Sequence, residues 1–187
     1  LFPMDIEWTR SYQVRLAIAG LFDDPLAVNA LEHINEVRII VNPNHRIAGL
    51  QLLAWIIHQT GWTRSLDLGL NSDASDTYYY ETNDGASVTI KLEMQADAAP
   101  ISLVMLSAPE CKIAVSRELN SPYFHQKLDA GNHQIDQCTP ANGDTAAELV
   151  MSQLSRGGKN TLYRKIMPTF LEFLGADDGH PRRMSVR

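Results

Sequence analysis

The sequence contains little that would support a disulfide framework, a membrane span or a nucleic-acid-binding surface. Two cysteines in 187 residues, Cys111 and Cys138, are too few for a disulfide scaffold and fit a reducing, cytoplasmic compartment. No apolar run reaches the roughly 18 residues that a membrane span needs, and the first residues show no secretion signal. With 22 acidic and 16 basic side chains, the net charge of -6 argues against a nucleic-acid partner.

The short motifs that accompany common enzyme chemistries are also missing. There is no glycine-rich dinucleotide loop, no phosphate loop, no HExxH and no GxSxG. Metal-ligand residue types cluster only at His125, His133, Asp136 and Cys138, in a spacing that fits no zinc site, so polar surface side chains are the preferred interpretation. The sequence therefore offers no candidate catalytic residues, and we expect no cofactor and no metal.

What is present indicates an ordinary globular domain. Apolar residues make up 44% of the chain and charged residues 20%, and the chain is long enough to bury a core. The order of helices, strands and helices predicts an α+β fold, with an antiparallel sheet of about five strands covered on one face by N-terminal and C-terminal helices. We expect residues 1–175 to form a single domain and residues 176–187 a flexible basic tail.

Helical spacing and capping residues predict the N-terminal helices. Apolar residues recur on one face of residues 8–22, and Asp24 followed by Pro25 can begin a second helix. Asn44 is expected to cap a third helix that ends at Gly61 and is apolar nearly all round, except for a narrow stripe at Gln51 and His58. Such a helix belongs in the middle of the domain.

The C-terminal region returns to helix. Thr145 and Glu148 form a capping box, and the helix they open is expected to close at Gly157-Gly158. Asn160 is expected to cap a last helix, which Pro168 should kink or split.

Alternating and β-branched residues predict the strands. Asn83-Asp84-Gly85 is a hairpin signal, and Pro109-Glu110 joins another strand pair. The expected strands are residues 37–41, 77–82, 87–95, 101–108 and 111–117, with a weaker one at 133–137.

Basic residues crowd around the predicted start of the last helix. Arg156, Lys159, Arg164 and Lys165 lie within ten positions of one another, and a helix N-terminus with neighbouring cations can hold an anion. The ligand could be a sugar phosphate or carboxylates of a protein partner. The alternative is that these are solvated charges on a helix surface.

The aromatic residues and the cysteines leave two further alternatives. Tyr78, Tyr79 and Tyr80 alternate across a strand, so at least one ring must face outward; with Tyr123 and Phe124 they form a candidate interface patch, or they shield the core. The two cysteines are either a redox pair or separate thiols. The phase of Cys111 with Ile113 and Val115 favours a buried thiol there, and Cys138 is expected to be exposed.

Several short segments resemble the OpcA family, the glucose-6-phosphate dehydrogenase assembly or effector proteins of cyanobacteria and actinobacteria, in both order and spacing. These segments are Met4-Asp5-Ile6-Glu7-Trp8-Thr9-Arg10, Leu21-Phe22-Asp23, Ile34-Asn35-Glu36-Val37, Leu52-Leu53-Ala54-Trp55 and Gly61-Trp62. They resemble the start of the family's C-terminal domain. Gln13 and Val14 depart from the expected proline and tryptophan, whereas Arg15 fits the pattern.

The resemblance implies a non-catalytic partner of glucose-6-phosphate dehydrogenase. Family members promote the assembled, active enzyme in the oxidative pentose phosphate pathway, and they carry an additional N-terminal domain that is expected to be missing from this chain. With the patches above, this implication makes Tyr79, Arg156, Lys159, Arg164 and Lys165 the candidate partner-binding or anion-binding residues. A sugar-phosphate-binding regulatory domain is the alternative.

Overall fold

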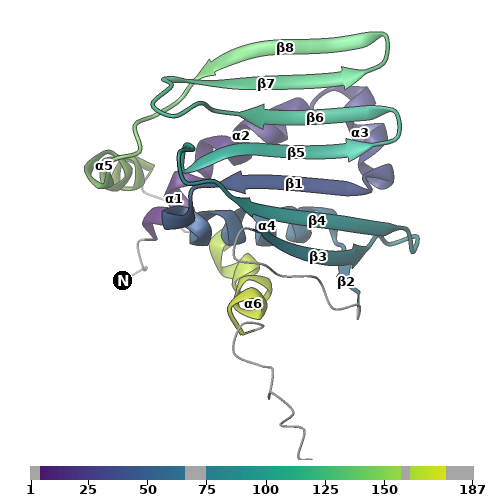
Figure 1. Cartoon of the computed structure of the whole chain (residues 1–187), viewed down its shortest axis with the longest axis horizontal. Coiled ribbons are helices and arrows are strands. Elements are labelled where there is room, and N and C mark those ends of the chain that lie inside the picture. Colours follow the sequence, from purple (N-terminus) through teal and green to yellow (C-terminus); the bar gives the residue numbers. More distant parts are fainter. Residues whose placement is uncertain (1–4, 66–74, 157–160, 176–187) are drawn as a thin grey trace, which may run out of the picture.

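A computed structural model of the chain describes residues 5–65, 75–156 and 161–175. These residues form one mixed sheet of eight strands, with helices against one of its faces (Figure 1). The order across the sheet is β2-β3-β4-β1-β5-β6-β7-β8, and all neighbours are antiparallel except β1 and β4, which are parallel. The strands are β1 Glu36–Val41, β2 Thr63–Arg64, β3 Ser75–Glu81, β4 Ser87–Met94, β5 Ile101–Ala108, β6 Cys111–Ser116, β7 Tyr123–Ala130 and β8 His133–Pro140.

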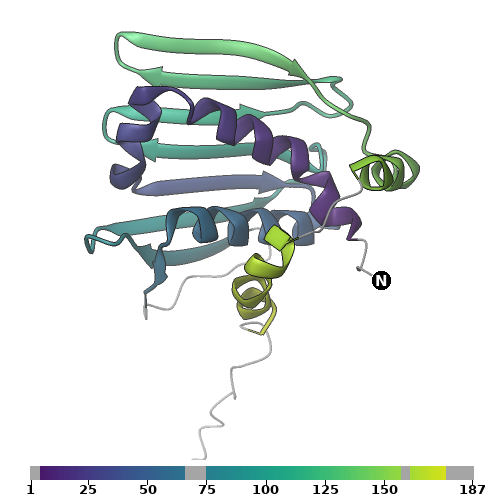
Figure 2. The same cartoon turned by 180° about the vertical axis from the view of Figure 1, so that it is seen from behind.

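The helices form the second layer, seen from behind in Figure 2. They are α1 Ile6–Arg10, α2 Tyr12–Leu21, α3 Pro25–Ala30, α4 Arg46–Thr60, α5 Ala146–Arg156 and α6 Thr161–Gly175, with short 3-10 turns at Leu31–His33 and Pro43–His45. α2 and α4 lie across the sheet, α6 packs beside α4, and α5 lies at one end of the sheet near α1 (Figure 2). None of the described helices is both long and apolar enough to cross a membrane.

The expected antiparallel sheet of about five strands is wrong, because the sheet has eight strands and one parallel pair. β7 was not predicted because a polar residue interrupts its buried side: Gln126 lies there between Phe124 and Leu128. Its side chain donates to Thr139 Oγ1 at 2.6 Å and accepts from Gln137 at 3.2 Å, which offsets the cost of burying an amide. The parallel pairing follows from the long connection between β1 and β4, which runs through α4, β2 and β3 before β4 joins the edge of β1 opposite β5.

Most local signals in the N-terminal half are confirmed, with two corrections. Asp24 caps α3 through Leu26 N at 2.9 Å, and Gly61 ends α4 in the left-handed conformation, with φ of 71°. The helix expected over residues 8–22 is divided at Ser11, whose buried hydroxyl donates to the carbonyl of Trp8 at 3.0 Å. Asn42, rather than Asn44, caps the turn that leads into α4.

α4 is the central helix, as predicted, and two of its residues show how it is seated. Gly49 faces the sheet so closely that a Cβ would lie 2.9 Å from methyl groups of both Val41 and Leu92. On another side Gln51 donates to Asp5 Oδ2 at 2.6 Å, and the Tyr163 hydroxyl of α6 donates to the same oxygen at 2.6 Å. Burial, together with this contact with Asp5, raises the pKa of Tyr163. Asp5 thereby joins α1, α4 and α6.

In the C-terminal region the capping box is confirmed. Thr145 N donates to Glu148 Oε2 at 3.1 Å and Glu148 N donates to Thr145 Oγ1 at 3.4 Å. α6 continues through Pro168 without being split. The predicted stop at Gly157-Gly158, the predicted cap at Asn160 and the predicted tail at 176–187 lie outside the described residues.

Candidate interaction surface

The structure places the predicted site residues on two sides of the molecule. Tyr79 lies half-buried in β3 on the face of the sheet that is away from the helices. Arg164 and Lys165 are exposed on α6, on the helical side. Arg156 ends α5, its side chain outside the described part, and Lys159 lies outside it altogether. Tyr79 and the basic residues of α6 therefore do not form one site, and their roles stay predictions.

The face of the sheet that carries none of the described helices has an apolar centre. Because side chains alternate along a strand, the residues between those packed on the helices point to this face. Ile40 of β1, Leu103 and Met105 of β5 and Ala114 of β6 do so, and each is half-buried. Ile40 pairs with Leu103, and Met105 pairs with Ala114. We call this side of the sheet the open face; solvated sheet faces are usually polar, so its centre is a candidate contact area.

Ion pairs within the chain flank this apolar centre on two sides, on β1 and β4 and on β7 and β8. Arg38 holds Glu93 with two hydrogen bonds of 2.7 and 2.8 Å, which lower the pKa of the Glu93 carboxyl. The other two pairs, Lys91 with Glu36 and Lys127 with Asp136, each have a nitrogen–oxygen distance of 3.0 Å. Because these charges are already matched, a partner could cover the centre without meeting an excess of one sign.

Two tyrosines lie towards opposite edges of the open face. Tyr79 pairs with Thr89 near one edge, and Tyr123, half exposed, pairs with Pro140 near the other. Five strand spacings separate them, or about 24 Å. The seven longer strands span an area of roughly 600–750 Å² in projection, close to the about 800 Å² that one partner contributes to a standard interface. The open face is thus large enough for a specific contact.

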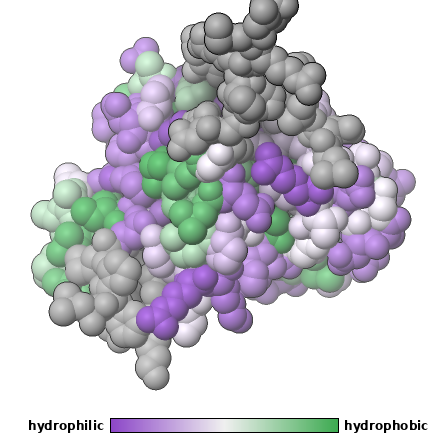
Figure 3. Space-filling model, turned by 90° about the horizontal axis from the view of Figure 1, so that it is seen from below, coloured by the Kyte–Doolittle hydropathy of each residue, from purple (hydrophilic) through white to green (hydrophobic). Residues whose placement is uncertain are grey.

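The helices also carry exposed apolar side chains. Figure 3 views the side on which α6 lies and shows hydrophobic areas separated by hydrophilic side chains. The exposed large apolar side chains of the described helices are Leu16, Leu26, Val28, Ile47, Met151, Leu154 and Leu171.

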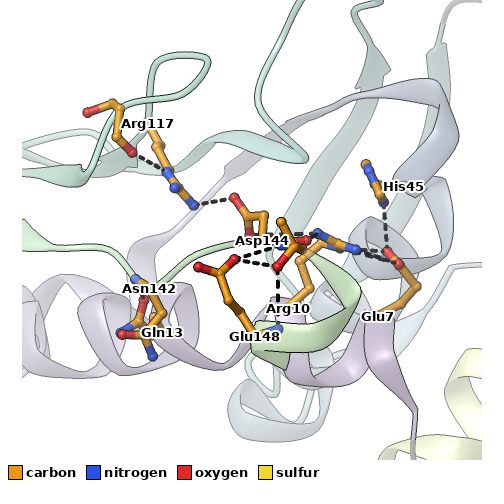
Figure 4. Close-up of polar contacts among 10 residues, drawn as sticks. Glu7, Arg10, Gln13, His45, Arg117, Asn142, Asp144 and Glu148 are labelled. Atoms are coloured by element: carbon orange, nitrogen blue, oxygen red, sulfur yellow. Dashed lines mark hydrogen bonds and ion pairs between the residues drawn. The ribbon is translucent and has the colours of Figure 1, made fainter. Parts of the chain in front are cut away.

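A polar cluster at the end of the sheet joins α1 to the segment before α5 (Figure 4). Arg10 donates to the backbone carbonyl of Asp144 at 2.8 Å and forms an ion pair with Glu7 at 3.2 Å. The Glu7 carboxylate also contacts His45 Nδ1 at 3.1 Å. Arg117 reaches the Asp144 carboxylate from the other side. Both arginine side chains are largely buried, with 8% and 11% of their area exposed. The two guanidinium groups therefore already have an internal carboxylate as their partner.

Two small hollows adjoin this cluster. Each has a cavity volume of only about 10 Å³, and Arg10, Arg117, Phe124 and Asp144 line both. Pockets that enclose small-molecule ligands usually measure about 300–1,000 Å³. Because both arginines already have partners and the hollows are small, the structure favours a structural role for this cluster, which joins α1 to the segment before α5, over a substrate site.

The cysteines and the proposed metal-ligand residues do not converge. Cys111 is buried and free, and Cys138 is exposed and free on the opposite face of the sheet. Burial raises the pKa of the Cys111 thiol. His125 lies 3.3 Å from Cys138 Sγ, whereas His133 contacts Asp24. Among the described residues, no group of three or more His, Cys, Asp or Glu side chains is arranged to hold a metal.

Residues of the N-terminal helices pack in the core. The Arg15 guanidinium carbon lies 3.2 Å from the centre of the Trp8 ring, and the Trp8 ring also packs on the Tyr163 ring, with 5.4 Å between the ring centres.

The open face was not predicted from the sequence, although a signal exists: Ile39-Ile40-Val41 and Leu103-Val104-Met105-Leu106 are apolar in both phases of the alternation. A strand with apolar residues in both phases has contacts to make on both faces.

Comparison with known sequences identifies one family model over most of the chain. The model, described as the C-terminal domain of a glucose-6-phosphate dehydrogenase subunit, matches residues 3–167. A comparison with curated proteins gave no match.

Solved structures share the fold at low sequence identity. Two crystal structures of variants of KijD10, a 3-ketoreductase from Actinomadura kijaniata, superpose with TM-scores of 0.56 and 0.54 at 10% and 9% identity. In each case the alignment covers 91% of this chain and 58% of the reductase. The likeness is one of architecture alone, and the chain spans little more than half of the reductase.

Proposed function

Because the chain belongs to the OpcA family, as a C-terminal domain of the glucose-6-phosphate dehydrogenase subunit type, we propose that it binds glucose-6-phosphate dehydrogenase and promotes the assembled, active form of that enzyme. It does so in the cytoplasm as a non-catalytic effector in the oxidative pentose phosphate pathway. Residues 1–175 act as one domain in this role. Activation requires only that the chain bind the active oligomer more tightly than the inactive form.

The observation that carries this proposal is the open face. An apolar centre with a polar rim is the usual anatomy of a protein interface, and tyrosines such as Tyr79 and Tyr123 are enriched at such contacts. Met105 lies near the middle, between Arg38 and Ala114 in the register. We expect it to be the most sensitive position for binding.

A binding experiment with variants on the two sides of the molecule tests this assignment. Met105→Asp places a charge in the apolar centre, whereas Val28→Asp makes the same kind of change at an exposed site on α3. With purified enzyme from the same organism, Met105→Asp should abolish co-elution, and Val28→Asp should retain it. Co-elution of folded Met105→Asp at the affinity of the unchanged chain would remove the open face from the proposal.

The basic residues of α6 are tested in the same assay. Lys165→Glu reverses an exposed charge on the helical side, and Tyr79→Ala shortens an aromatic side chain on the open face. We expect Tyr79→Ala to weaken binding by the roughly tenfold or more that characterises an interface aromatic. A loss confined to Lys165→Glu would move the contact to α6.

A further inference from the structure

The two edges of the sheet are built differently. β2, at one edge, has two residues, and a short strand is a common means of protecting an edge from pairing. β8, at the other edge, has eight residues in unbroken register with β7. Asp136 is its only acidic or basic residue apart from His133, and it is already paired with Lys127. Among the described residues, no strand pairs with the outer side of β8.

The hairpin geometry shows which backbone groups point outward. Gly131 and Asn132 form a two-residue turn, with φ of 66° at Gly131, between the paired residues Ala130 and His133. In such a hairpin the flanking pair is hydrogen-bonded, and the bonds recur at every second residue. The bond from Ala141 N to Pro122 O at 2.8 Å continues this series. The N–H and C=O groups of the even-numbered residues Gln134, Asp136 and Cys138 therefore point away from the sheet.

Apolar side chains border this edge. α2 and α3 pack over β6 and β7, and two contacts join them to the ends of β8: Gln13 accepts from Asn142 N at 2.6 Å, and Asp24 contacts His133 at 2.8 Å. Leu16 lies three residues after Gln13, on the same side of α2, and is 54% exposed. Ile135 lies half-buried on this side of β8. A partner strand at the edge would contact Ile135.

We propose that β8 is a self-pairing edge, which joins antiparallel to β8 of a second copy about a two-fold axis at Ile135. In this register Gln134 of one chain faces Asp136 of the other, so an amide donor meets a carboxylate, and Ile135 faces its own copy. Each Gln134–Asp136 pair exchanges two backbone hydrogen bonds. The contact is isologous, as in most dimers, and extends the open face across two chains.

Neighbouring registers are less favourable. An axis at Asp136 places two carboxylates directly opposite each other, which destabilises a strand pair. An axis at Gln137 places Gln134 opposite Pro140, which has no N–H to donate. The axis at Ile135 avoids both, and this self-complementarity is the reason to assign a second copy as the occupant.

The mass of the chain in solution tests the pairing without the enzyme, so its outcome is independent of the proposed function. Light scattering during size exclusion should give twice the 20.9 kDa of one chain at high concentration. Asp136→Pro removes an outward N–H and none of the bonds to β7, so it should give a folded monomer by circular dichroism. A monomer for the unchanged chain at every concentration would overturn the proposal, as would a dimer that survives Asp136→Pro.

Charge changes at Gln134 test the register. Gln134→Glu faces Asp136 of the other copy in two symmetric contacts and should weaken dimerisation roughly 2- to 30-fold, whereas Gln134→Lys should strengthen it. Gln95→Glu and Gln95→Lys make the same changes in net charge at an exposed site beyond β4 and control for general repulsion. Equal effects at Gln134 and Gln95 would refute the register, and a dimer broken only by Met105→Asp would place the contact on the open face instead.

Discussion

Replacement of Gly49 by alanine measures how tightly α4 is seated on the parallel pair β1 and β4. In a helix interior this change normally stabilises a protein by about 0.5–1 kcal/mol. Here the new Cβ would lie 2.9 Å from Val41 Cγ1 and 2.9 Å from Leu92 Cδ1. Both methyl groups belong to fully buried side chains, so the crowding cannot be relieved towards solvent. Overpacking of this kind costs about 1–3 kcal/mol.

Gly20→Ala in α2 is the matched control, because a Cβ there would have no atom within 4 Å. The helix propensity gain is common to both variants, so their difference in unfolding free energy isolates the overpacking and should be about 1–3 kcal/mol. Urea unfolding followed by circular dichroism measures it, provided that the m-value is unchanged. If Gly49→Ala were as stable as Gly20→Ala, the close approach of α4 would be refuted.

Three further predictions concern the buried hydroxyl of Tyr80, the Thr145 cap of α5 and the ion pair between Arg117 and Asp144. Burial raises the pKa of Tyr80 to about 12, and its hydroxyl has no hydrogen-bond partner among the residues that the structure describes, so Tyr80→Phe should raise the unfolding free energy by about 1 kcal/mol. Since the pKa of Tyr80 is higher in the folded chain than in the unfolded chain, the unfolding free energy of the unchanged chain should fall from about pH 10 towards pH 12. The variant should lose less over this range, and an identical fall in both proteins would contradict the prediction. Thr145→Ala removes the cap of α5 and should cost about 0.5–2 kcal/mol in thermal unfolding, and an unchanged melting temperature would count against the capping box. Arg117→Gln removes the closer of the two arginines that hold the Asp144 carboxylate and should cost about 1–3 kcal/mol. Lys112→Gln, at an exposed site on β6, the strand that precedes Arg117, should change stability by less than about 0.5 kcal/mol; equal effects in urea would argue against a structural role for the Arg117–Asp144 pair.

Local chemistry determined which elements could be predicted from the sequence. The Asn83-Asp84-Gly85 turn, the stop at Gly61 and the Thr145–Glu148 capping box each depend on a few neighbouring residues, and all three are present. β7 could not be recognised, because Gln126 breaks its apolar alternation and its hydrogen-bond partners lie on another strand. Longer-range pairing, such as β1 with β4, leaves no local pattern.

The candidate site was predicted only in part, for a similar reason. Tyr79 lies on the open face, but the half-buried centre around Met105 depends on which strands become neighbours. Strands apolar in both phases were the available signal. The basic residues near the last helix follow one another in sequence, yet α6 lies on the other side of the sheet from Tyr79.

The most direct test of the central claim is a titration of the purified chain into glucose-6-phosphate dehydrogenase from the same organism, with NADPH formation and the mass of the complex followed together. We expect the rate to rise to a plateau as the chain co-elutes with the assembled enzyme, and Met105→Asp to remove both effects while Val28→Asp keeps them. A folded chain that neither co-elutes with the enzyme nor changes its rate would contradict the effector role.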